Sequence, residues 1–185
     1  MQRRLLPLAS FALLPLALTL GLTTACGPKD LPREEIDKVL FPSEGVFAGY
    51  DFGTSWEDIK ANHPEQFVVR DDDFKQLRRD VGDNAGSNGY FIGFGLDDAG
   101  KVTSFDAAIS GKKQNAVAVR VLLDDLIAHY DKTIGNGSCI RTGTDDNSSS
   151  CRWETPGKPR VEIMYLEMRD PISGSIHIDV NPPTP

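Results

Sequence analysis

The residues of this chain that could carry acid-base chemistry are few and widely spaced. Its three histidines are His63, His129 and His177. We place His63 at a helix end, where a cationic side chain suits the helix dipole, His129 on the polar side of a helix, and His177 on the outward face of a strand. No Gly-x-Ser-x-Gly elbow, His-Glu-x-x-His helix or phosphate-binding loop occurs in the sequence. The sequence therefore predicts structural roles for the three histidines and no catalytic residue.

Metal ligands are equally sparse. The run Asp71-Asp72-Asp73 lacks the alternating spacing, the glycine and the distal glutamate of a calcium loop. A zinc site at Cys139 and Cys151 lacks nearby partners, because the histidines are scattered. We therefore expect a solvated turn at the acidic run, and neither a metal nor a cofactor.

A further cysteine, Cys26, closes an N-terminal segment that has the parts of a secretory signal. Arg3 and Arg4 precede an uncharged stretch at 5–22, and small residues lead up to the cysteine. This order is that of a signal peptide that is removed at its C-terminal end. We expect cleavage to remove residues 1–25.

The segment Leu22-Thr23-Thr24-Ala25-Cys26 resembles the lipobox of bacterial lipoproteins, with Thr23 in place of the more usual leucine. The resemblance implies that Cys26 carries lipid at the mature N-terminus and that 26–33 is a tether. It places the protein at the cell membrane or outer membrane, facing the periplasm or the exterior. Two other interpretations stay open: a transmembrane anchor, for which the run is short, and a simple cleavable signal followed by an ordinary thiol.

Cys139 and Cys151 then remain as an even pair. An exported protein meets an oxidising compartment in which disulfides persist, so the sequence predicts a bond between these two cysteines. The bond would close a loop at 140–150, whose acidic, amide and serine side chains bury little apolar surface. A loop of that size is stabilised by about 3 kcal/mol in the chain-entropy description.

Length and charge define the class of the mature chain. The 160 residues after the predicted cleavage site fit one domain at 34–185, or two small units, and can bury a substantial core. Loss of Arg3 and Arg4 changes the formal charge from −7 to −9. An acidic chain whose longest basic run is two residues disfavours nucleic acid and favours a basic partner, unless the charge serves solubility alone.

Hydrophobic periodicity predicts helices followed by antiparallel strands. The expected helices are 34–41, 56–62 and 116–133. The expected strands are 67–70, 74–81, 90–96, 102–109, 161–168 and 175–180. In the last strand Ile176, Ile178 and Val180 alternate inward, with His177 and Asp179 outward.

A shift of 71 residues superimposes the two best hairpins of this prediction. We therefore predict an α+β fold with an antiparallel sheet and helices on one face. The repeat suggests two tandem helix-plus-hairpin units, at 34–111 and 112–185.

Two segments of the mature chain carry a resemblance in outline. Gly-Thr-Ser-Trp-Glu-Asp-Ile at 53–59 opens a helix, and Phe-Gly-Leu-Asp-Asp-Ala-Gly-Lys-Val at 94–102 forms a hairpin. With these segments behind a lipoprotein signal, the chain resembles the small outer-membrane assembly lipoproteins of the SmpA/OmlA type. The doubled unit resembles β-lactamase inhibitor protein, in which two helix-plus-sheet units form one concave binding sheet. The resemblance implies an α+β fold and a binding role.

Trp56 and Trp153 are the candidates for partner contact, because exposed indoles anchor interfaces, although indoles at such places also pack inward. The sequence as a whole predicts a lipid-anchored binding protein of the cell envelope rather than an enzyme. It would be an assembly or structural factor, or an inhibitor or immunity protein that occupies a periplasmic enzyme. The alternative is an envelope hydrolase with an unrecognised site, which needs a cleft holding titratable groups with perturbed pKa values.

Overall fold

A computed structural model gives the fold and describes residues 30–63, 67–69, 74–80, 88–142, 147–169 and 172–184. The predicted signal at 1–25, Cys26 and the acidic run at 71–73 lie outside the described residues. Within the described part, no helix combines the length and the apolar character that crossing a bilayer requires.

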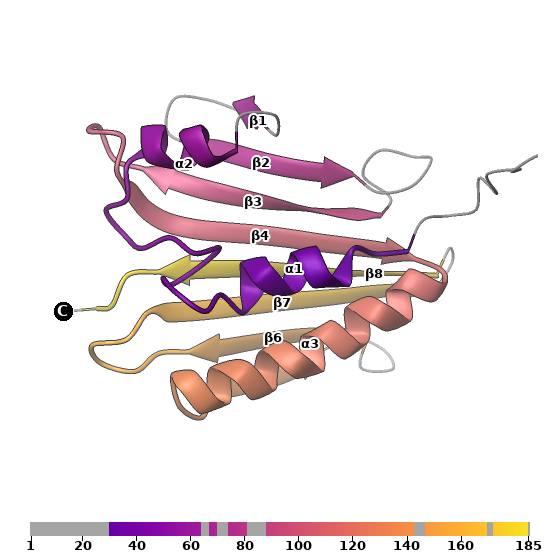
Figure 1. Cartoon of the computed structure of the whole chain (residues 1–185). Helices are drawn as coiled ribbons and strands as arrows, with labels where there is room; N and C mark the ends of the chain where they lie inside the picture. Colours follow the sequence, from indigo (N-terminus) through magenta and orange to yellow (C-terminus); the bar gives the residue numbers. More distant parts are fainter. Residues whose placement is uncertain are drawn as a thin grey trace, which may run out of the picture.

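The described chain forms three helices and one antiparallel sheet (Figure 1). The helices are α1 (Arg33–Leu40), α2 (Trp56–Asn62) and α3 (Gln114–Thr133). The strands are β1 (Phe67–Val69), β2 (Phe74–Asp80), β3 (Gly89–Leu96), β4 (Val102–Lys112), β5 (Ser138–Thr142), β6 (Ser148–Trp153), β7 (Arg160–Arg169) and β8 (Ile172–Asn181). The helices pack on one face of the sheet, so the predicted α+β class is confirmed.

Local sequence explains where α1 and α2 begin or end. The Ser55 hydroxyl accepts a hydrogen bond from the Asp58 backbone N–H at 3.2 Å and caps α2 at the bounds that the sequence predicts. Pro42 lies two residues after Leu40, the last residue of α1. Proline has no backbone N–H, so it cannot donate the hydrogen bond that another helical turn would need. These short helices are therefore fixed by their termini as well as by packing.

The sheet consists of two four-stranded meanders, β1–β4 and β5–β8, in the order β1-β2-β3-β4-β8-β7-β6-β5. The central pair, β4 and β8, joins them, with Ala107 opposite Ile178. Gly111 and Gly174 lie opposite one another where α3 crosses this pair, and a Cβ added at Gly111 would lie 2.6 Å from the Asn115 carbonyl oxygen. Glycine at these positions lets the helix approach the sheet backbone closely.

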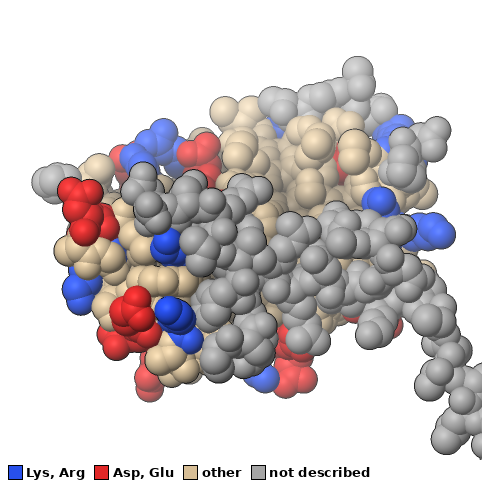
Figure 2. All heavy atoms as spheres, turned by 90° about the horizontal axis from the view of Figure 1, so that it is seen from above, with Lys and Arg blue, Asp and Glu red and all other residues tan. Residues whose placement is uncertain are grey.

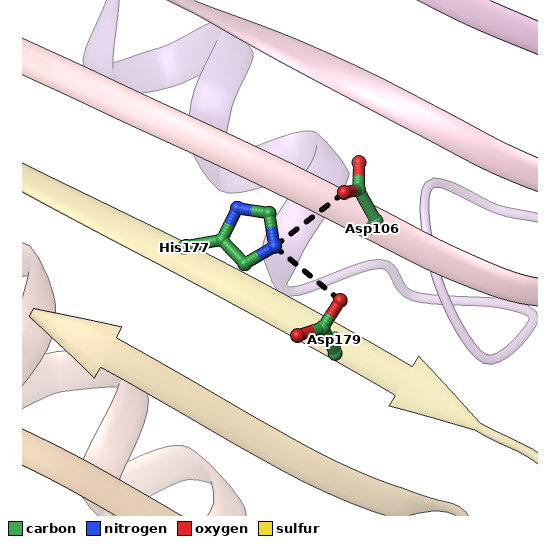
Figure 3. Close-up of side chains that lie close together, drawn as sticks. All are labelled: Asp106, His177 and Asp179. Atoms are coloured by element: carbon green, nitrogen blue, oxygen red, sulfur yellow. Dashed lines mark ion pairs between the residues drawn. The ribbon is translucent and has the colours of Figure 1, made fainter.

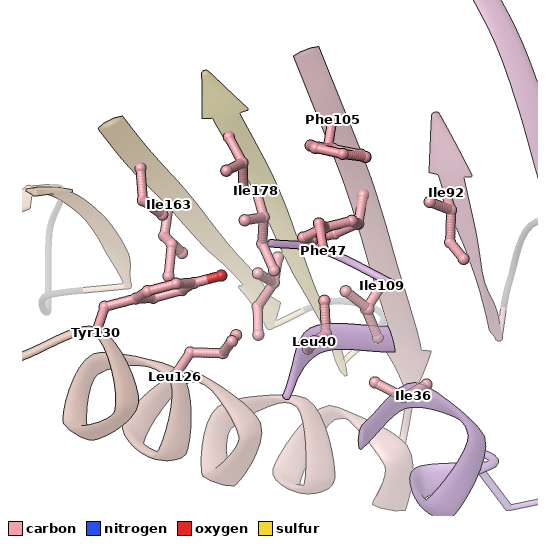
Figure 4. Packing of buried hydrophobic residues seen from close by; sticks show 14 of the residues in the cluster. Ile36, Leu40, Phe47, Ile92, Phe105, Ile109, Leu126, Tyr130, Ile163 and Ile178 are labelled. Atoms are coloured by element: carbon pink, nitrogen blue, oxygen red, sulfur yellow. The ribbon is translucent and has the colours of Figure 1, made fainter. Parts of the chain in front are cut away.

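The core lies between the sheet and the helices, and Figure 4 shows its packing. The predicted inward residues Ile176, Ile178 and Val180 are at most 1% exposed. The buried stripe of α3 completes the layer, with Val119, Leu122, Leu123, Leu126 and Tyr130. Full burial of an aliphatic side chain of this size contributes about 1.5–3 kcal/mol, so these alternating residues hold the helices on one face.

The segment around the disulfide corrects the prediction of a loop at 140–150. Residues 138–142 form β5 and residues 148–153 form β6, and the two strands pair with Cys139 opposite Cys151. The two sulfur atoms are 2.08 Å apart, so the predicted disulfide is confirmed. The serines of β5 and β6 have little intrinsic strand preference. Pairing of β6 with β7, together with the disulfide between β5 and β6, stabilises the two strands instead.

Removal of the disulfide is expected to destabilise the fold without changing its topology. The bond links residues 12 apart in sequence, and a loop of this length corresponds to about 3 kcal/mol of unfolding free energy. We expect the variant Cys139→Ala with Cys151→Ala to lose about that much in urea denaturation. Reduced wild-type protein is the control and should behave alike. A double variant as stable as the oxidised protein would contradict this account.

Candidate functional site

The helices leave the other side of the sheet uncovered by any element of the described chain, and we call that side the open face. Figure 1 shows α1 and α3 in front of the sheet, and the open face lies behind it. Because side chains alternate along a strand, each strand that buries one set of residues against the helices presents the other set on the open face. In β7 the buried set is Val161, Ile163 and Tyr165.

Apolar side chains gather on the open face along β7. Met164, Leu166 and Met168 are 47%, 47% and 52% exposed, and Ile140 of β5 is 61% exposed. These four residues are called the apolar strip below. Three large apolar side chains at successive outward positions of one strand form a continuous patch, unlike single exposed apolar residues, which are ordinary on protein surfaces.

The neighbours of the apolar strip on the open face are serines, except for His177 opposite Met164. The strand register places Leu166 between Ser148 of β6 and Ser175 of β8. Met168 lies opposite Ser173. Serine side chains reach much less far from the sheet than methionine or leucine, so the strip projects above its surroundings and is accessible to another molecule.

A charged cluster adjoins the strip on the open face (Figure 3). His177 Nε2 lies 3.4 Å from Asp179 Oδ1 and 3.5 Å from Asp106 Oδ2. The strand register brings these three side chains together. Asp106 of β4 lies opposite Asp179 of β8, and His177 precedes Asp179 by two residues, on the same face of β8. The contact with Asp179 raises the pKa of His177 most, burial works against it, and the charges of both carboxylates raise it further.

The cluster offers one nitrogen and two carboxylate oxygens within 4.8 Å of one another, a ligand set that zinc accepts. An imidazolium held between two carboxylates accounts for the same distances without an ion. The residues opposite His177 on the two neighbouring strands are Ala108 and Met164, neither of which is a nucleophile for acyl or glycosyl transfer. The geometry is that of a charge cluster on a surface.

The two other histidines have structural neighbours. His63 Nε2 lies 2.9 Å from the Tyr50 hydroxyl at the end of α2. His129 packs edge to face on Phe41 at 5.0 Å, and burial, with the nearby Lys132 charge, lowers its pKa. The outward position predicted for His177 is confirmed, and His129 is more enclosed than the polar side of a helix implies.

The structure corrects the expectation that the two tryptophans contact a partner. Trp153 is 1% exposed and its Nε1 donates to Asp131 Oδ1 at 2.8 Å, while Trp56 is 9% exposed and packs on Phe94. Their large apolar rings stabilise the fold more by filling the core than by facing water. Neither indole is available as an exposed anchor.

One cavity lies at the opposite end of α3 from Gly111. It measures about 240 Å³ and its lining includes Tyr130, Ile134, Val161 and Val180. The lining is mostly apolar and contains no carboxylate, and its titratable members are His129, Tyr130 and Lys158.

The view of the molecule from above gives the arrangement of charge at one of its ends. Figure 2 shows acidic and basic side chains next to one another at the left end of that view. Such interspersed charges suit solubility.

The apolar strip is the main feature of the open face that sequence analysis did not single out. Residues 163–166 are apolar without interruption, so alternation cannot separate an inward set from an outward set there. The uninterrupted run was itself the available signal, because a half-buried strand of an antiparallel sheet ordinarily alternates with polar residues.

A comparison of the chain with protein-family models, with curated proteins and with solved structures gives no match.

The charged cluster leads to a testable prediction about the pKa of His177. Because the contact with Asp179 contributes most to the raised pKa, Asp179→Asn is expected to lower the pKa of His177. Nuclear magnetic resonance of the imidazole signals measures the shift directly. Asp124→Asn, on the exposed side of α3, is the control and should leave that pKa unchanged.

The sign of the accompanying stability change follows from linkage. Protonated His177 stabilises the fold fully below its unfolded pKa of about 6.5, and this contribution is lost as pH rises through the folded pKa. A His177 pKa that does not respond to Asp179→Asn would contradict the assignment of the cluster.

Proposed function

We propose that this protein is a lipid-anchored binding protein of the cell envelope that docks a partner protein on the open face of its sheet. One observation carries the proposal. The apolar strip stands exposed on a sheet face that no described helix covers, while every described helix packs on the other face. Large exposed apolar patches on soluble domains mark interaction sites, because their burial against a partner is favourable.

The residue types of the strip support binding over catalysis. Methionine is enriched in protein interfaces, and its flexible thioether adapts to a partner's shape. The serines of β6 and β8 leave room for partner side chains on both sides of the strip. The protein would act by occupying a surface of its partner, as an assembly or structural factor or as an inhibitor or immunity protein.

Anchoring is the second part of the proposal and rests on the lipobox-like segment before Cys26. A diacylglycerol and an acyl chain together would hold the protein at the membrane, since two hydrophobic attachments give stable anchoring where one gives only reversible binding. The open face would then meet partners in the periplasm or at the cell exterior.

Replacement of Cys26 tests the anchor. The variant Cys26→Ser cannot accept lipid on sulfur, so we expect an uncleaved or soluble protein and loss from washed membrane fractions. Mass spectrometry of the N-terminal peptide identifies the attached groups. If the serine variant is processed and fractionates as the wild type does, the lipoprotein assignment is wrong.

Two pairs of substitutions test the open face. Full-length protein with a C-terminal affinity tag is cross-linked in the cells that produce it and purified in detergent. Met164→Lys with Leu166→Lys should reduce the recovered partner about tenfold, because charge replaces the apolar contact. Val117→Lys with Val121→Lys is the matched control, since these valines are at least as exposed as Met164 and Leu166 but lie on α3.

The outcomes of this test separate binding from catalysis. Equal loss of partner from both pairs would refute docking on the open face, provided that circular dichroism shows each variant folded. Hydrolysis of an envelope substrate by the purified protein, abolished by His177→Ala, would replace the binding proposal with the envelope hydrolase.

A further inference from the structure

The outward side chains of β7 change character along the strand. Met168, Leu166 and Met164 occupy successive outward positions, and Glu162 takes the next. At about 3.4 Å per residue, Glu162 lies about 14 Å along the strand from Leu166. The outward side chains of β7 are therefore apolar from Met168 to Met164, acidic at Glu162 and basic at Arg160, where the strand begins.

The acidic character at Glu162 extends across three strands. Glu162 of β7 lies opposite Asp179 of β8, and Asp179 lies opposite Asp106 of β4. These three carboxylates are called the acidic row. Arg152 of β6 lies opposite Glu162, and His177 lies beside Asp106 and Asp179, so positive groups already accompany the row. Like charges directly opposite on neighbouring strands repel one another and destabilise a sheet. A positive group brought by another molecule would relieve that repulsion.

Resting on the proposed function, we propose that the open face binds an extended segment of a partner protein that lays apolar side chains on the apolar strip and a lysine or arginine over the acidic row. The two features lie side by side, because Met164 of the strip is opposite His177 of the cluster. One continuous segment thus reaches both, with its basic residue about four positions from its apolar ones, since an extended chain rises about 3.4 Å per residue.

Charge complementarity selects a basic partner over an acidic one. The chain has a formal charge of −7. On β6, the outward Arg152 lies opposite Glu162 of the acidic row and pairs with Glu154 at 2.8 Å. On β7 and β4, Arg160 and Lys112 are outward near the two ends of the face, and the acidic row with His177 lies between them. An acidic partner would meet repulsion at the row, which gives discrimination by charge.

The same arrangement makes binding depend on pH. Below its raised pKa, His177 is an imidazolium that neutralises part of the acidic row and repels an incoming lysine or arginine. Above that pKa the imidazole is neutral and the row attracts the cation more strongly. The complex is therefore expected to tighten as pH rises through the titration of His177.

A pair of peptide probes tests the proposal on the full-length lipidated protein in detergent. The first is the blocked peptide Leu-Thr-Leu-Thr-Arg-Thr-Arg, and the second carries glutamate in place of both arginines. Apart from Met1 in the predicted signal, Met164 and Met168 are the only methionines, so carbon-13 labelled methionine methyls report on the apolar strip. The arginine peptide should shift these signals with an affinity at least about threefold higher than the glutamate peptide.

Variants and pH complete the test. Asp179→Asn should remove the preference for arginine, whereas the control Asp124→Asn should keep it. Affinity for the arginine peptide should rise with pH in the wild type and lose most of that dependence in His177→Gln. Equal affinity for both peptides, no methyl shift with either, or a preference unchanged by Asp179→Asn would overturn the proposal.

The proposed function can survive this failure. If partner recovery still depends on Met164 and Leu166 while the peptides fail, docking on the strip stands and the basic segment is wrong. If recovery is insensitive to the strip but the peptides discriminate, the charge preference stands without the proposed docking site.

Discussion

The backbone ladder between β4 and β8 is the interaction on which the rest of this structure depends. It joins the two meanders from Phe105 opposite Val180 to Lys112 opposite Ser173. Without it each meander would end in an unpaired edge, and unpaired edges invite association with other chains. The ladder also creates the charged cluster, because its register places Asp106 against Asp179. Fold and candidate site thus share one set of hydrogen bonds.

The two faces of the central strands differ in what they contribute to the fold. Inward residues such as Ile178 are fully buried and gain free energy from leaving water. Outward residues such as His177 contribute little to the core, so they can hold charges that the fold would not otherwise favour. Successive residues of a strand point to opposite faces, so neighbouring residues can differ in this way. Helices on both faces would bury the outward residues as well.

Sequence periodicity predicts the helices and the hairpins closely, because these depend on local pattern. The number of cysteines predicts the disulfide. Periodicity misses β5 and β6, whose serine-rich segments gain order from pairing with β7. It does not decide whether Trp153 faces inward, since that depends on the place of Trp153 in β6, a strand that the sequence does not predict. The meeting of Asp106 and His177 is also hidden: the shift of 71 residues aligns them, but no local signal indicates that their strands pair.

The place of β8 at the centre of the sheet has a consequence for biogenesis. Phe105 pairs with Val180, so the first meander is synthesised with the β4 edge unpaired until almost all of the chain has followed. Contacts between residues so far apart in sequence form slowly, because the loop-closure entropy is lost before the contacts are gained. In the interval the β4 edge is open to pairing with a second nascent chain, so this topology carries a risk of misassembly during synthesis.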